Sequence, residues 1–185
     1  VKFPEDSNYR HPDGSSDKQV GSFTITETQP VLYTVTFDGN GNTSGAMTAL
    51  ELTGGSTQTL PDCGYTKTKY QFTGWLYGGK TYKPGDSFTT PYGDVTFTAQ
   101  WQAVFEVSGT IKEETGSGEQ DTENAVVSLW LGANKIAETH TEADGTYSFD
   151  DLLPGIYNLV VSKDQRTVTS MVDLTTTDRT CNAIL

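Results

Sequence analysis

Turn residues interrupt this chain so often that they constrain the fold more than any other feature. Nineteen Gly and seven Pro divide the sequence, and Thr, Val, Tyr and Phe dominate the stretches between them. β-Branched and aromatic residues bounded by turn residues are typical of short strands. No stretch of helical length has apolar residues at the i, i+3, i+4, i+7 spacing of an amphipathic helix. We therefore expect an all-β, or mainly β, protein.

The chain divides into a polar start and two small segments of strand-like pattern. A length of 185 residues leaves room for two small cores. Residues 1–30 are polar and contain one strand-like alternation at residues 21–26, which indicates a linker or the end of a preceding unit. We expect the two modules to span residues 31–102 and 103–185. No Gly/Ser linker separates them, so their junction should be short and stiff.

The first module begins with Val31, Tyr33, Val35 and Phe37, which alternate with other residues as in a strand and lead into the turn-forming DGNGN at residues 38–42. The segments YTVTFDGNG, LP, GYT, FTGW, YKPGD and DVTFTAQW follow in this order. Together they resemble the Listeria-Bacteroides repeat, the B-repeat module of internalin-type surface proteins. The resemblance implies a small β-grasp-like sheet that serves in arrays as a spacer or interaction module on bacterial surfaces.

The second module shows turns every eight to twelve residues, which favours a Greek-key sandwich. Its segments VSGTI, AVVSLW and TEADGTYSFDDLLPGIYNLVV resemble the carboxypeptidase regulatory-like family and the related collagen-adhesin B-type modules. This resemblance implies a transthyretin-like sandwich that accompanies or spaces other domains and has no active-site residues. The strands expected in it are residues 105–111, 125–131, 135–142, 146–149, 155–162, 167–174 and 180–185.

Charge is unevenly distributed between the two modules. Residues 103–185 contain 5 Lys or Arg and 14 Asp or Glu, whereas residues 31–102 contain 4 and 5. The acidic excess disfavours binding to nucleic acid and to anionic membranes, and we interpret it as a solvated face. No apolar run is long enough to span a bilayer. The chain opens on a polar segment and not on a signal peptide, so for an exported parent we expect an internal or processed piece.

The adhesin resemblance implies one covalent hypothesis, an internal isopeptide bond. In B-type modules such a bond joins a first-strand Lys to a last-strand Asn beside an acid, and Lys112 and Asn182 are the residues at those places. The acid is missing, because Val160 and Val161 follow Tyr157-Asn-Leu where the adhesin pattern has Glu. Without a carboxyl group to transfer the proton, we expect the amide not to form.

Metal and redox chemistry have weak candidates. Residues 38–42 have oxygen side chains at alternating positions but lack a distal bidentate Glu, so their turn chemistry explains them. Asp144, Asp150 and Asp151, with Glu142, are weak calcium candidates, and solvated loop acids are the alternative. His11 and His140 are too isolated for zinc. Cys63 and Cys181 form no motif, so two separately buried thiols are favoured over a disulfide between the modules.

The sequence predicts no catalytic residues and no cofactor, because it contains neither a nucleophile motif nor a paired-acid motif. Sugar binding is the functional alternative. Trp75 and Trp101 fall where the first module needs core, whereas Trp130 becomes the best ligand-contact candidate if it faces solvent. We expect a non-catalytic spacer or interaction segment of a secreted or cell-wall-attached bacterial protein, whose partners are proteins or glycans. The alternatives are an adhesin module and an accessory segment of an extracellular hydrolase.

Overall fold

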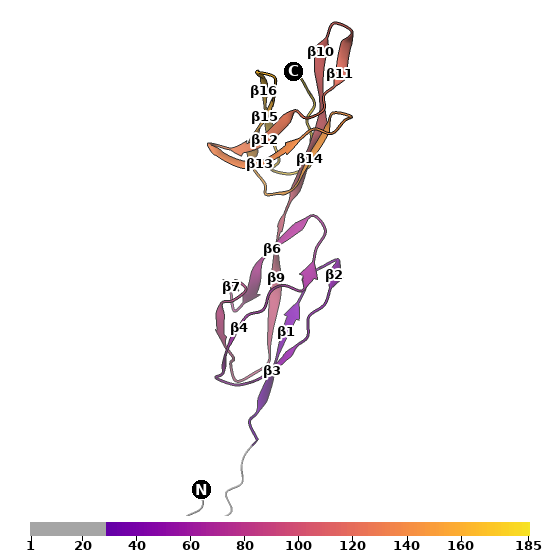
Figure 1. Ribbon diagram of the computed structural model, residues 1–185. Coiled ribbons are helices and arrows are strands. Elements are labelled where there is room, and N and C mark those ends of the chain that lie inside the picture. Colours follow the sequence, from indigo (N-terminus) through magenta and orange to yellow (C-terminus); the bar gives the residue numbers. More distant parts are fainter. Residues whose placement is uncertain (1–28) are drawn as a thin grey trace, which may run out of the picture. The chain divides into compact units, whose positions relative to one another are not determined.

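The structure of the protein is a computed structural model that describes residues 29–185 (Figure 1). Within these residues the chain forms strands and turns and no helix, which confirms the all-β fold class. The strand-like alternation at residues 21–26, and nearly all of the expected linker 1–30, lie outside the described residues. None of the described elements is a helix long and apolar enough to cross a membrane.

The N-terminal part of the described chain, residues 31–103, is built on one five-stranded sheet and two small ribbons. The sheet order is β3-β1-β9-β6-β7, and β2 pairs with β5 and β4 with β8. The strands are β1 (Leu32–Asp38), β2 (Ser44–Gly45), β3 (Leu50–Thr53), β4 (Thr57–Thr59), β5 (Tyr65–Thr66), β6 (Tyr70–Tyr77), β7 (Lys80–Tyr82), β8 (Ser87–Thr89) and β9 (Val95–Ala103).

The first and last strands of this part, β1 and β9, lie side by side and run parallel. Val35 is opposite Val95, and Asp38 is opposite Thr98. Because the two strands point the same way, the chain enters the sheet at one end and leaves it at the other. The remaining pairs in the sheet are antiparallel.

Alternating apolar residues of β1 and β9 build the core of the N-terminal part. Val35, Phe37, Phe97 and Ala99 are all buried and pack with Trp75 of β6, which has no exposed surface. The ring centroids of Phe37 and Trp75 are 5.0 Å apart, a distance typical of tilted aromatic pairs. This confirms the prediction that Trp75 belongs to the core. Trp101 is partly buried against the same cluster.

The C-terminal part, residues 105–185, contains two facing sheets. One has the order β13-β12-β15-β16, and the other has the order β11-β10-β14, with β17 and β18 also paired to β10. The strands are β10 (Phe105–Thr115), β11 (Gly118–Asp121), β12 (Val126–Leu131), β13 (Asn134–His140), β14 (Thr146–Leu152), β15 (Ile156–Lys163), β16 (Arg166–Asp173), β17 (Arg179–Thr180) and β18 (Ala183–Ile184).

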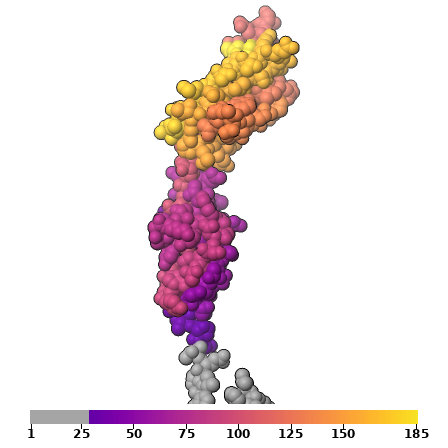
Figure 2. Space-filling view, turned by 90° about the vertical axis from the view of Figure 1, so that its left-hand side faces the viewer, coloured from indigo at the N-terminus to yellow at the C-terminus, as the bar shows by residue number. Residues whose placement is uncertain are grey.

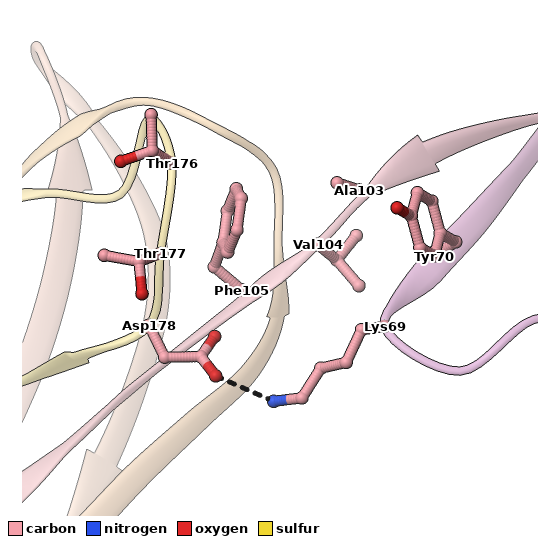
Figure 3. Close-up of a pocket in the computed structure, with 8 residues that line it drawn as sticks. All are labelled: Lys69, Tyr70, Ala103, Val104, Phe105, Thr176, Thr177 and Asp178. Carbon is pink, nitrogen blue, oxygen red and sulfur yellow. Dashed lines mark hydrogen bonds and ion pairs between the residues drawn. The ribbon is translucent and has the colours of Figure 1, made fainter.

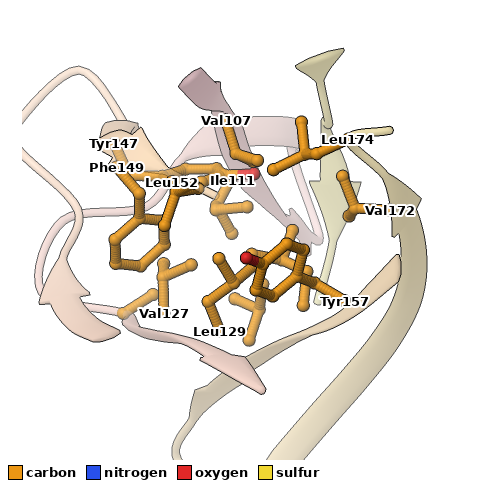
Figure 4. Close-up of a cluster of buried hydrophobic side chains, with 13 residues drawn as sticks. Val107, Ile111, Val127, Leu129, Tyr147, Phe149, Leu152, Tyr157, Val172 and Leu174 are labelled. Carbon is orange, nitrogen blue, oxygen red and sulfur yellow. The ribbon is translucent and has the colours of Figure 1, made fainter. Parts of the chain in front are cut away.

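A second core lies between these two sheets, separate from the first (Figure 4). Val107 and Ile111 of β10 face Val127 and Leu129 of β12, and all four side chains are fully buried. Tyr147 and Phe149 alternate into this core as the sequence predicts. The other members are Ala125, just before β12, and residues of β14, β15, β16 and the turn after β16. Burying a Val or Leu side chain stabilises a fold by about 1.5–3 kcal/mol.

The first and last strands of the C-terminal part are also parallel neighbours. Val107 of β10 is opposite Arg179 of β17, and Lys112 is opposite Ile184 of β18. The chain therefore again enters at one end of its sheet and leaves toward the other. Only Val104, itself buried, separates the end of β9 from the start of β10.

Candidate functional site

The outer face of the four-stranded sheet β13-β12-β15-β16 presents the sequence-predicted ligand residue, Trp130, together with polar neighbours. Along β12 the side chains alternate, so Val127 and Leu129 enter the core while Ser128 and Trp130 point to the opposite face. Trp130 is half-buried on that face. In Figure 2 the C-terminal part is the portion of the molecule coloured from orange to yellow.

Two hydrogen bonds fix the indole of Trp130. Its Nε1 donates to Ser128 Oγ at 2.9 Å, and Ser128 Oγ donates to the Val160 carbonyl at 3.3 Å. Ser128 is buried, which strengthens its hold on the ring because water does not compete there. The polar edge of the indole is thus satisfied within the protein, and its ring surface is left for packing.

Cross-strand register places distant residues beside Trp130. Asn158 of β15 lies opposite Trp130, and Met171 of β16 lies opposite Asn158. Lys135 of β13 is opposite Trp130 on the other side and forms an ion pair with Glu138 at 2.9 Å. Met171 is 75% exposed. A cross-strand row of one aromatic, one amide and one thioether side chain can pack on an apolar ligand surface and hydrogen-bond its rim.

The two isopeptide candidates, Lys112 and Asn182, line one surface hollow, and each has another polar partner. The Asn182 side-chain oxygen accepts the Thr110 N–H at 2.9 Å. The Lys112 ammonium lies 3.8 Å from Glu119, and both of these side chains are more than 40% exposed. Glu119 is therefore no buried acid of the kind that amide formation needs.

The structure does not gather the calcium candidates into one site. Asp144 lies in the turn before β14, where its Oδ1 accepts hydrogen bonds from the N–H and hydroxyl of Thr146. These bonds hold the pKa of Asp144 below its usual range. Asp150 and Asp151 lie toward the far end of the same strand, about 20 Å of extended chain away. Within residues 29–185 no three His, Cys, Asp or Glu side chains are grouped around a metal position.

The loop at residues 38–42 is a turn whose polar groups are already used. Asp38 Oδ1 accepts the backbone N–H of Asn40, and Asn40, with a positive φ of 49°, donates from Nδ2 to the Ala99 carbonyl. Asn42 donates to the Ser44 carbonyl. Asp and Asn favour such turns because their side chains replace backbone hydrogen bonds.

A second hollow lies where β9 passes into β10 (Figure 3). The Lys69 ammonium reaches Asp178 at 3.1 Å and Glu106 at 3.6 Å, and Asp178 Oδ1 accepts the Glu106 N–H. That backbone bond and then the Lys69 hydrogen bond lower the pKa of Asp178. The Val104 N–H donates to the Lys69 carbonyl at 3.0 Å. Sequence reasoning missed this cluster because its members are distant in the chain: Lys69 and Asp178 lie 109 residues apart, and Glu106 and Asp178 lie 72 apart.

The remaining candidates from the sequence, Cys63, Cys181 and His140, lie in strands or against the two cores. Cys63 packs on the N-terminal core and Cys181 on the C-terminal core, both as free thiols, and burial raises the pKa of each. His140 is the exposed last residue of β13. Asn158 and Met171 were not predicted as site residues. The sequence could have placed Trp130 on the outer face, because Trp130 and Ser128 are two residues apart in one strand and therefore share a face.

These features define an all-β protein of small sheets with one aromatic side chain on an outer sheet face. Each of the two parts matches a known family model. Residues 33–100 match the Listeria-Bacteroides repeat domain, which confirms the predicted repeat. Residues 103–182 match the second β-sandwich domain of the BOS complex subunit NOMO1-like family. For these residues the sequence predicted a β-sandwich that resembles the carboxypeptidase regulatory-like family. The matched family is also a β-sandwich family, and its name differs from the predicted one.

No curated protein matches the chain. Several solved structures are loosely similar. A Pseudomonas aeruginosa protein proposed to bind carbohydrate is 14% identical over 44% of this chain and 88% of its own, with a TM-score of 0.35. The minor pilin of Streptococcus agalactiae is 11% identical over 75% of this chain and 68% of its own (TM-score 0.36). A group B streptococcus pilus backbone protein is 15% identical over 66% and 51% (TM-score 0.32). At these values the similarities carry no functional argument.

Proposed function

We propose that residues 31–185 are a non-catalytic spacer or interaction segment of a secreted or cell-surface bacterial protein. Its two modules are residues 31–102 and 103–185. Two separate cores and two adjacent family matches support this division. The Listeria-Bacteroides repeat match supports the bacterial surface location.

The observation that carries the spacer role is the parallel pairing of first and last strands in both modules. β1 pairs with β9, and β10 pairs with β17 and β18. A module whose terminal strands are antiparallel neighbours returns the chain to its starting end. A module with parallel terminal strands carries the chain forward, so each one adds length between the segments on either side.

Spin labels at Leu32 and Gln102 test this geometry in the whole chain, with Cys63 and Cys181 replaced by Ser. Val35 is opposite Val95, so the two labelled positions are ten residues apart along the strands. A rise of about 3.3 Å per residue gives about 33 Å between the two backbones. Double electron–electron resonance should report a single distribution near this distance. A much shorter separation, as antiparallel terminal strands would give, would contradict the spacer role.

Glycan binding on the outer face of the C-terminal sheet is the second candidate, and the half-buried Trp130 favours it. The Trp130 ring, Asn158 and Met171 are cross-strand neighbours, and an aromatic ring beside an amide suits the apolar face and hydroxyl rim of a sugar ring. The net charge of this module favours neutral over acidic glycans. A glycan array tests it. A hit that Trp130→Ala abolishes and Tyr92→Ala retains would support binding here, since Tyr92 is an 82% exposed aromatic of the other module.

A further inference from the structure

Strand β16 forms a long, regular sheet edge with which no other described strand pairs. It pairs with β15 over eight consecutive residues, from Arg166 opposite Lys163 to Asp173 opposite Ile156, with no register shift. It is the last strand in its sheet, so its other side has no neighbouring strand among residues 29–185. Unpaired strand edges are templates for pairing with another chain.

The free edge presents the backbone groups of Thr167, Thr169 and Met171. The Leu174 N–H donates to the Gly155 carbonyl just beyond the strand, at 2.8 Å. Hydrogen-bonded pairs alternate along an antiparallel ladder, so the even-numbered residues of β16 bond to β15. The odd-numbered residues then point their N–H and C=O groups away from it. The carbonyl of Asp173 follows this rule, because it accepts from Arg179 Nε at 2.8 Å.

The middle of this edge lacks the charged residues that the other long edges have. Residues 167–172 are uncharged and contain no Pro, Gly or bulge. Charges and bulges are the usual means of blocking edge pairing. β13, at the opposite side of the same sheet, has both, because its register shifts near Ala137 and it contains two charged residues. The other edge strands of four or more residues carry charge as well: Glu51 in β3, Glu119 in β11 and Asp150 in β14.

We infer that β16 pairs antiparallel with β16 of a second copy of this chain. The register is Thr169 opposite Thr169 of the second copy and Thr167 opposite its Met171. In this register the N–H and C=O groups of Thr167, Thr169 and Met171 in each copy all find partners. It also keeps the apolar faces of the two sheets on the same side, since odd-numbered residues meet odd-numbered residues. The paired sheets form one continuous sheet.

Charge favours a second copy in this orientation. The strand has a cation, Arg166, at one end and an anion, Asp173, at the other. Antiparallel pairing places the Arg166 end of each strand beside the Asp173 end of the other, whereas parallel pairing would place ends of like charge side by side. The rest of each C-terminal part is acidic and repels the other copy over a distance. Salt screens charges more than about 8 Å apart at physiological ionic strength, so association should strengthen as salt is raised.

Sedimentation equilibrium of the whole chain, from micromolar to millimolar concentration, tests this inference. The expected result is a monomer–dimer equilibrium. Hydrogen exchange on the same samples should show the amides of Thr167, Thr169 and Met171 becoming protected as concentration rises. Monomer at every concentration would overturn the inference, and so would a dimer in which these three amides exchange at the monomer rate.

Thr169→Pro is the decisive variant. It removes an N–H that points to the free edge and takes no part in the β15 ladder, a position at which strands tolerate Pro. Both reciprocal bonds at the centre of the dimer are lost, and two carbonyls are left unpaired, so association should weaken about tenfold or more. His140→Pro is the matched control. The Asn124 and Thr141 backbone bonds place the His140 N–H on the free side of β13. A Thr169→Pro protein that dimerises as strongly as the unmodified chain would overturn the inference.

Discussion

Replacing Gly109 with Ala tests the pairing of β10 with the C-terminal strands, because the added methyl group has no room. Gly109 lies in β10 opposite Tyr147. A Cβ atom at this position would overlap the Cys181 carbonyl oxygen and lie 2.7 Å from the carbonyl carbon and 3.1 Å from the Tyr147 ring. The carbonyl belongs to the backbone, so the segment that carries β17 and β18 must move away.

The size of the effect follows from the bonds that such a movement breaks. The Cys181 N–H donates to Ser108 O at 2.8 Å, and the Tyr147 hydroxyl donates to Cys181 O at 2.8 Å. Each hydrogen bond contributes about 1 kcal/mol net, and overpacking costs about 1–3 kcal/mol more. Replacing Gly with Ala also lowers the conformational entropy of the unfolded chain, which offsets about 0.4–1 kcal/mol of this loss. We expect the free energy of unfolding of the C-terminal part to fall by about 2–4 kcal/mol.

Urea denaturation followed by hydrogen exchange and mass spectrometry measures this change separately for each part of the chain. The amide of Cys181 should lose protection first, while peptides of the N-terminal part should not change. Gly116→Ala is the control, because its Cβ would meet no atom within 4 Å. It should be neutral or slightly stabilising. A Gly109→Ala protein within about 0.5 kcal/mol of the unmodified protein would refute the proposed clash.

Three further predictions concern covalent state, pH and packing. The intact mass should equal that of the sequence, because the acid that an isopeptide bond between Lys112 and Asn182 needs is missing; a mass one ammonia lighter would show that the bond forms. The pKa of Asp178 is lowered because the Glu106 N–H and then the Lys69 ammonium favour the charged carboxylate. The ionised Asp178 therefore stabilises the fold above the ordinary carboxyl pKa, and this contribution disappears as the pH falls through the lowered pKa of the folded protein. Stability curves of Asp178→Asn and the unmodified protein should therefore converge in acid. Leu129→Ala should cost about 2–5 kcal/mol in urea denaturation because Leu129 is fully buried, whereas Leu131→Ala, at a 43% exposed site, should cost about 0.5 kcal/mol or less.

Most strands of the core could be predicted because alternation is a local signal. Val35 and Phe37, or Tyr147 and Phe149, show it directly, and the structure buries all four. The extension of β10 to Thr115 and its partner β11 were missed. The residues after Lys112 are polar on both faces, so they have no alternation, and backbone pairing across a glycine turn forms that ribbon.

The surroundings of Trp130 could be predicted only in part. That this side chain faces away from the core follows from the burial of Leu129 beside it, which is a local property of one strand. Its neighbours Asn158 and Met171 depend on the register of β12, β15 and β16. That register cannot be read from local sequence patterns, because packing between residues far apart along the chain sets it. The Lys69–Asp178 ion pair could not be predicted from the sequence for the same reason.

The parallel terminal strands also determine how the protein responds to mechanical tension. A force applied to the two ends of either part would pull β1 against β9, or β10 against β17 and β18, along the strand direction. The hydrogen bonds of each pair would then be loaded in shear and would have to break together, whereas an antiparallel terminal pair would open one bond at a time. A chain held between an anchor and a ligand in flowing liquid would therefore resist extension through its backbone pairing, without any covalent cross-link.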